Sequence, residues 1–225
     1  FVPVALAPRD GSRSVHVTRE PACSSFYPPE PGILEAFPTL ETVSVDRIVD
    51  VPTQRLDTWA TRRQISRVDV IKLDTQGSEL EILQGAGSLL DSVALVDTEV
   101  EFNPIYAGQP LFGDVDRFLR GAGFVLWRLT NLVHYRWRGV DGVHRSPDHQ
   151  AFDFDNVGFI RGTGQLYWGH AMFVRKDLLL GGGDKATRQR LIQFASAVGV
   201  SDLAETVAVN AAGAGERRQS QPQEQ

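Results

Sequence analysis

The chain has 225 residues and is 42% hydrophobic, which is enough for one domain of ordinary size with a sizeable core. Its formal net charge of −5 and its lack of any apolar run of about 18 residues argue against a nucleic-acid partner and against a membrane span. Its one cysteine, Cys23, excludes an internal disulfide, which is consistent with a cytoplasmic protein.

The N-terminal part of the chain alternates strand patterns with irregular segments. Residues 1–7 and 14–19 are predicted strands, joined by a Pro-Arg-Asp-Gly turn. The proline-rich residues 20–38 are expected to be irregular. A short strand at 42–49 and a short helix at 56–63 are expected to follow.

A buried-strand pattern at residues 68–73 runs through an acidic turn into a helix. Gly77 allows a tight turn, and Ser78 and Glu81 have the spacing of a capping box at the helix start. Open α/β sheets bind ligands at the carboxyl ends of their strands. Asp74, directly after the strand, is therefore the first candidate for a functional side chain.

Residues 93–102 predict a second strand, apolar at first and acidic toward its end. Its carboxylates alternate along the strand and so share one face: Asp97, Glu99 and Glu101. An amphipathic helix at 111–122 and a strand at 124–129 are expected next. This alternation of strands and helices predicts an α/β fold with a parallel, right-handed wound sheet.

The C-terminal part is less regular. Residues 130–168 are expected to form a polar and aromatic insertion, and 171–176 a final strand. Three glycines at 181–183 predict a linker, after which Asp184 is expected to cap a helix at 185–198. The expected divisions are a main domain at 1–180, a helical appendage at 181–210 and a disordered tail at 211–225.

The strand-turn-helix resembles the FkbM family of S-adenosylmethionine-dependent methyltransferases, which carries the pattern I-K-x-D-x-x-G-x-E-x-x-x-L-x-G-A. The matching residues are Ile71, Lys72, Asp74, Gly77, Glu79, Leu83, Gly85 and Ala86. Weaker similarity is found at residues 99–102, 106–112, 116–124 and 166–175. Together these segments extend the resemblance over roughly residues 1–176.

The resemblance implies a Rossmann-like class I methyltransferase sheet, mostly parallel with a C-terminal antiparallel strand. It also implies S-adenosyl-L-methionine as cofactor and O-methylation of a hydroxyl on a small molecule such as a sugar, a glycolipid or a polyketide. Class I enzymes hold the methionine part of the cofactor with a glycine-rich turn, often D-x-G-x-N-x-G, and this sequence contains no such turn. An alternative is therefore a non-catalytic interaction module of the same fold, without cofactor binding.

The chain begins with Phe1 inside an apolar run rather than with methionine, from which we expect that an N-terminal segment is missing. In the resembled fold, two central strands would then be absent. The strand at residues 1–7 would have no neighbour within the chain, and unpaired buried amides cost about 1 to 3 kcal/mol each. We therefore expect this chain alone to be unstable or rearranged, and inactive.

Seven residues are expected to form the functional site of the resembled fold. The expected catalytic residues are Asp74, Glu101 and His170. The expected cofactor contacts are Asp74, Lys72 and Ala5. The expected substrate contacts are Glu99 and Tyr106. No metal is expected, although the acidic residues could offer oxygen ligands to Mg²⁺.

Structural interpretations of the same residues stay open. Asp74 could cap the helix that follows it, and Glu99 and Glu101 could form salt bridges at the strand end. Lys72 could pair with a carboxylate. His170 stands where the family pattern has an acidic residue; it could act as a base near neutral pH or be an ordinary surface or core residue.

Overall fold

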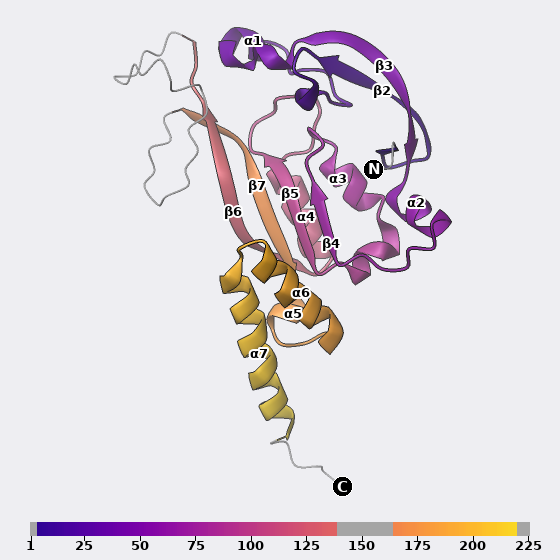
Figure 1. The fold of residues 1–225 in the computed structure, drawn as a ribbon. Coiled ribbons are helices and arrows are strands. Elements are labelled where there is room, and N and C mark those ends of the chain that lie inside the picture. The colour runs from indigo at the N-terminus through magenta and orange to yellow at the C-terminus, as the bar shows by residue number, and fades with distance from the viewer. Residues whose placement is uncertain (1–3, 139–163, 220–225) are drawn as a thin grey trace.

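The computed structural model describes residues 4–138 and 164–219, which form two sheets with helices around them (Figure 1). The mixed α/β class expected from the sequence is confirmed. In Figure 1 the strands β2 and β3 curve above the upper ends of β4 and β5, whereas α6 and α7 lie at the opposite end. The carboxyl ends of β4 and β5 therefore point toward the N-terminal part of the chain.

The larger sheet has four strands in the order β4-β5-β7-β6. Their bounds are Val70–Leu73 for β4, Leu95–Glu101 for β5, Gln165–Arg175 for β7 and Phe124–Tyr135 for β6. The strand β4 runs parallel to β5, and β7 runs antiparallel to both of its neighbours. This arrangement confirms the strand-helix-strand prediction after residue 68 and the expected antiparallel C-terminal strand.

One apolar core lies between this sheet and the helices α3 (Glu79–Gln84) and α4 (Phe112–Gly121). A second core forms with α5 (Lys176–Leu179), α6 (Lys185–Ala197) and α7 (Ser201–Gln219). The buried residues of β5 divide between the two cores: Leu95 belongs to the second, and Val96 and Val100 to the first. The sheet is thus covered on both faces, as the near-continuous apolar strand pattern predicts.

The smaller sheet has the order β1-β3-β2, with β1 at Ala5–Leu6, β2 at Gly11–Thr18 and β3 at Val45–Gln54. The expectation that the first strand lacks a neighbour is wrong, because β1 pairs in parallel with the end of β3. The amide of Ala7 also donates to the carbonyl of Gln54 at 3.0 Å. Buried backbone groups need partners, and β3 supplies them here. The chain was expected to be unstable because this strand would be unpaired, and the observed pairing removes that reason.

The segment between β2 and β3 contains only short helical turns, as its prolines predict: η1 (Pro21–Cys23), α1 (Ile33–Ala36) and η2 (Pro38–Val43). A third apolar cluster joins this segment to the far ends of β6 and β7. The short helix expected after β3 is α2 (Leu56–Arg62). The N-terminal segment is thus packed against the end of the larger sheet where β4 and β5 terminate.

The capping box expected at the start of α3 does not form. Ser78 is the N-cap residue but makes no side-chain cap bond, and its hydroxyl donates to the carbonyl of Thr75 at 3.3 Å. Glu79 closes the turn before the helix, since its carboxylate accepts the amide of Thr75 at 2.6 Å. Glu81 forms an ion pair with Arg13 on β2 instead. A tertiary ion pair has replaced a local cap.

The C-terminal part differs from the sequence prediction in length. The strand expected at 124–129 extends to Tyr135 and the final strand begins at Gln165, because the two pair with each other. Residues 139–163 of the expected insertion lie outside the described residues. The expected cap at Asp184 is confirmed, since its carboxylate accepts the amide of Thr187 at 2.9 Å.

The disorder expected from residue 211 is wrong up to Gln219, where α7 ends. Most of residues 211–219 are alanine, glutamate, arginine and glutamine, which have high helix propensity, although two glycines lie among them. Residues 220–225 lie outside the described residues, and the domain boundary expected at residue 180 stays a prediction. Within residues 4–138 and 164–219, no helix is both long and apolar enough to cross a membrane.

Candidate functional site

Five of the predicted site residues line one cavity of about 320 Å³: Asp74, Glu99, Glu101, Tyr106 and His170. We call it the acidic cavity. It lies at the carboxyl ends of β4 and β5, where Asp74 directly follows β4 and the two glutamates end β5. His170 arrives from β7, where it is the register partner of Glu99. The strands β5 and β7, the turn after β4 and the loop after β5 therefore bring these side chains together.

The other two predicted residues, Ala5 and Lys72, line a neighbouring cavity of about 400 Å³ between β1 and β4. The turn after β4 separates the two cavities, since Thr75 lines the second and Asp74 and Gln76 line the acidic one. The hydroxyl of Ser25 pins this turn by donating to the carbonyl of Gln76 at 2.6 Å. The predicted cofactor contacts are thus divided between two adjoining spaces.

Glu99 is only 6% exposed, and its surroundings favour the protonated acid. Burial, and after it the nearby charges of Glu101 and Asp74, together raise the pKa of Glu99 to about 10. Its Oε2 accepts a hydrogen bond from the side-chain amide of Gln76 at 2.9 Å. At neutral pH, Glu99 is therefore a neutral carboxylic acid in the wall of the cavity.

Glu101 is also buried near other acidic groups, but its pKa is raised less than that of Glu99. It is 3% exposed, and burial followed by the charge of Glu79 raises the pKa of Glu101 to about 8. Glu79 is itself 2% exposed, and burial raises its pKa. Asp74, in contrast, is exposed to solvent. The acidic cavity thus holds buried acids that keep protons beside an exposed acid.

His170 is half-buried and contacts Lys72, whose Nζ lies 3.0 Å from Nδ1 of the ring. Burial lowers the pKa of His170, and the positive charge of Lys72 lowers it further. A lysine ammonium can only donate hydrogen bonds, so Nδ1 is the acceptor and Nε2 carries the proton of the neutral ring. In this tautomer, Nε2 presents a hydrogen-bond donor rather than a base.

Tyr106 is 1% exposed, and its hydroxyl faces partners inside the protein. The hydroxyl donates to the carbonyl of Cys23 at 2.6 Å and lies 3.1 Å from Oε1 of Gln76. Burial raises the pKa of Tyr106, so the phenol keeps its proton. Its ring forms part of the cavity wall, while its hydroxyl ties the loop after β5 to the segment after β2.

Gln76 was not among the residues predicted from the sequence, although it contacts several of them. Its backbone is left-handed, with a φ of +56°, and its amide group contacts Asp74, Glu99 and Tyr106. The only local signal was its place between Asp74 and Gly77 in the turn. Trp168 on β7 also lines the cavity, where its indole donates to the hydroxyl of Tyr135 at 2.8 Å.

Among the described residues, no group of three or more histidine, cysteine, aspartate or glutamate side chains is placed to hold a metal ion. Glu99 in the acidic cavity keeps its proton at neutral pH and accepts the side-chain amide of Gln76.

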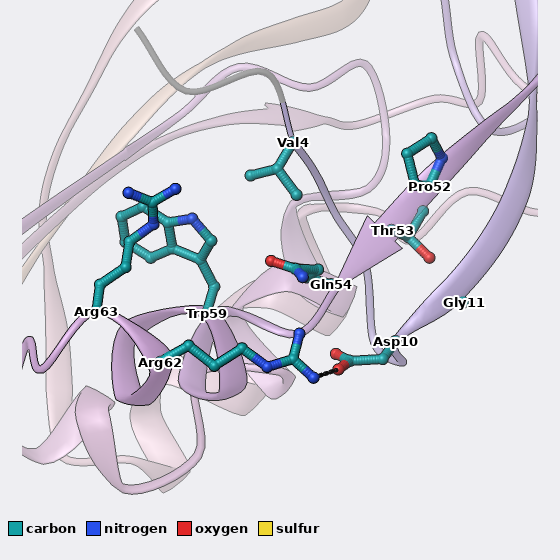
Figure 2. A pocket seen from close by; sticks show the side chains of 9 residues that line it. All are labelled: Val4, Asp10, Gly11, Pro52, Thr53, Gln54, Trp59, Arg62 and Arg63. Atoms are coloured by element: carbon teal, nitrogen blue, oxygen red, sulfur yellow. Dashed lines mark hydrogen bonds and ion pairs between the residues drawn. The ribbon is translucent and has the colours of Figure 1, made fainter.

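A third cavity, of about 580 Å³, lies beside α2 and the end of β3 (Figure 2). The guanidinium of Arg63 stacks over the ring of Trp59 at 5.0 Å, and Arg62 pairs with Asp10 at 3.0 Å. Among the described residues that line this space, none is a predicted site residue. We therefore treat it as separate from the acidic cavity.

Comparison with known proteins agrees with the resemblance of the strand-turn-helix. A family model described as the methyltransferase FkbM domain matches residues 2–126. The 2-O-methyltransferase NoeI of Sinorhizobium fredii (strain NBRC 101917 / NGR234) is 33% identical over 101 residues, which are 40% of this chain and 42% of that protein. The match thus spans less than half of that relative's length. No solved structure shows a significant match.

Proposed function

Because this chain belongs to the FkbM methyltransferase family, we propose that it transfers a methyl group from S-adenosyl-L-methionine to a hydroxyl of a small molecule. The observation that carries this proposal is the acidic cavity, where Asp74, Glu101 and His170 meet at the carboxyl ends of the strands. Ligands of open α/β sheets bind at this edge. The name of the relative, a 2-O-methyltransferase, supports an oxygen atom as the acceptor.

The cavity between β1 and β4 fits part of this cofactor. Its walls combine apolar side chains such as Leu6 and Phe26 with the hydroxyls of Ser25 and Thr75. Its volume of about 400 Å³ lies within the usual range for small-molecule sites. Among the described residues that line it, none is a carboxylate that could bind the ribose hydroxyls. We assign the adenine end of the cofactor, which is its less polar end, to this space. Ala5 and Lys72 are its proposed contacts there.

Bound S-adenosyl-L-methionine supplies an activated methyl group on a sulfonium. The protein has to align the acceptor hydroxyl and remove its proton. We propose that Asp74, at the boundary between the two cavities, attracts the positively charged part of the cofactor. We further propose that Glu99, as a neutral acid, donates a hydrogen bond to the acceptor, and that the Tyr106 ring forms one wall.

Glu101 is our choice for the general base. A base works best when its pKa lies near the operating pH, and a pKa of about 8 meets this condition for Glu101. His170 then acts as a hydrogen-bond donor through Nε2, because Lys72 occupies Nδ1. The polar walls and the rings of Tyr135 and Trp168 suit an acceptor with several hydroxyls, such as a sugar.

The test combines cofactor binding with transfer. The chain would be mixed with S-adenosyl-L-methionine in a calorimeter, and with the tritiated cofactor and a panel of sugars and other alcohols. Saturable binding and label in an oxygen-linked methyl group are the expected results. If neither binding nor transfer occurs in a folded sample, the proposal fails, and the interaction module without a cofactor becomes the better reading.

A further inference from the structure

We propose that Gln76 is a positioning residue that fixes the carboxyl groups of Asp74 and Glu99 in the acidic cavity through its side-chain amide. This inference rests on the proposed function for its meaning in catalysis, but its geometry stands independently. Gln76 lies in the turn between the two cavities and contacts three of the predicted site residues.

The backbone of Gln76 is held in a conformation that glutamine seldom adopts. Its φ of +56° lies in the left-handed region, and Gly77 follows with a φ of +99°. Left-handed conformations of residues other than glycine persist where the surrounding structure enforces them, and they are found preferentially at functional sites. Here the hydroxyl of Ser25 holds the carbonyl of Gln76 at 2.6 Å.

The side-chain amide then faces three of the residues that line the cavity. Nε2 donates to Oδ1 of Asp74 at 3.3 Å and to Oε2 of Glu99 at 2.9 Å. Oε1 lies 3.1 Å from the hydroxyl of Tyr106. An amide nitrogen has two N–H donors, so one group bridges two carboxyl groups from two different strand ends.

The hydrogen bonds from Gln76 to Asp74 and Glu99 matter because several carboxyl groups lie close together in this cavity. Their mutual repulsion opposes the ionisation of all of them at once. Titratable groups surround Glu99 on every side: Asp74 from the turn after β4, Glu79 from α3, Glu101 from β5, Cys23 from η1, Tyr106 from the following loop, Tyr135 from β6 and His170 from β7. Lys72 on β4 and Asp97 on β5 act on His170 from the same side of the sheet. A neutral amide orients the two bridged acids without adding charge. A positively charged side chain in its place would lower the pKa of Glu99 and favour the ionised form.

The sequence supplies a matched control. Gln64 has nearly the same backbone, with a φ of +58°, but it is exposed in the loop after α2. Gln76→Asn keeps a residue that tolerates the left-handed region, yet its amide is one methylene too short to reach Glu99. Gln64→Asn makes the same chemical change away from the cavity. Gln76→Gly is the second variant, since glycine adopts a positive φ without strain.

The first readout needs no enzymatic activity. Carbon-13 NMR of labelled glutamate carboxyls would follow Glu99 from pH 6 to 10.5 in each folded variant. Loss of the amide donor removes a group that favours the ionised form, so Glu99 should stay protonated to higher pH in both Gln76 variants. The Gln64→Asn protein should titrate like the wild type. Identical titration of Glu99 in all four proteins would overturn the proposal.

The second readout is kinetic. A positioning role predicts that kcat falls about tenfold in Gln76→Asn, because Glu99 loses its 2.9 Å amide donor. KM for S-adenosyl-L-methionine should rise by less than kcat falls, because Asp74, which we assign to the cofactor, loses only the longer contact at 3.3 Å. Equal kinetics in Gln76→Asn and Gln64→Asn would reject the role in catalysis. If the wild type transfers no methyl group, the proposed function fails, and the NMR titration still decides whether Gln76 organises the acids.

Discussion

The Nζ atom of Lys72 lies 3.0 Å from Nδ1 of His170, so that a side chain of β4 contacts a side chain of β7 across the intervening strand β5. Lys72 lines the cavity between β1 and β4, whereas His170 lines the acidic cavity. This contact therefore joins the two spaces that we assign to cofactor and acceptor. The same contact determines which ring nitrogen of the neutral His170 carries the proton, because the ammonium of Lys72 donates to Nδ1.

Lys72→Met should raise the pKa of His170. The positive charge of Lys72 is the second cause of the lowered value, after burial, so its removal leaves the burial effect in place. We expect a partial recovery of the pKa of His170 toward the ordinary histidine value. The C2 proton of His170 in NMR spectra reports this titration. An unchanged midpoint in the variant would mean that the contact does not form in solution.

Glu99→Gln should make the stability of the protein less sensitive to alkaline pH. The folded pKa of Glu99 is raised to about 10, so the folded state binds more protons than the unfolded state above the ordinary glutamate pKa. Stability from this group is complete below that ordinary value and decreases as the pH rises toward 10, by about 1.4 kcal/mol per pH unit. Glutamine is always neutral and removes this slope.

The measurement is urea unfolding of wild type and Glu99→Gln at pH 6, 7.5 and 9. The variant should gain stability relative to the wild type with each step in pH. Asp91→Asn is a suitable control, because this aspartate is exposed and is not among the residues that line the acidic cavity. Parallel pH dependence in wild type and Glu99→Gln would show that Glu99 is ionised in the folded protein.

The central strand-turn-helix and the gathering of acids were predictable because they depend on local patterns. Period-two alternation along β5 places Glu99 and Glu101 on one face, and the parallel pairing with β4 brings Asp74 to the same edge. His170 meets Glu99 only through the register of β7 with β5, and no local pattern determines that register.

Non-local pairing also explains the failures. The partner of β1 is the far end of β3, a contact that no pattern within either segment specifies. Gln76 was overlooked because its role depends on a left-handed backbone and on Ser25 and Tyr106, which come from distant parts of the chain. The capping box failed for the same reason, since Arg13 on β2 recruits Glu81.

Glu101→Gln should reduce methyl transfer by about 100-fold to 10,000-fold if Glu101 is the general base. In the wild type, kcat should increase as the pH rises through about 8, because the ionised form of Glu101 accepts the proton. The variant should lose this rise while keeping its affinity for S-adenosyl-L-methionine. A pH–rate profile over pH 6 to 9.5, with calorimetric binding at pH 7.5, tests both statements. Retention of the rise in Glu101→Gln would assign the base to another residue.

Tyr106→Phe should destabilise the protein by about 1 kcal/mol, because it removes a buried hydrogen bond to the carbonyl of Cys23. The hydroxyl already has partners inside the protein, so the aromatic ring, which the variant keeps, is the part available to an acceptor. We therefore expect KM for the acceptor to change less than threefold. Urea unfolding and steady-state kinetics of the same preparation separate the two effects. A large increase in KM with unchanged stability would instead place the hydroxyl of Tyr106 on the acceptor.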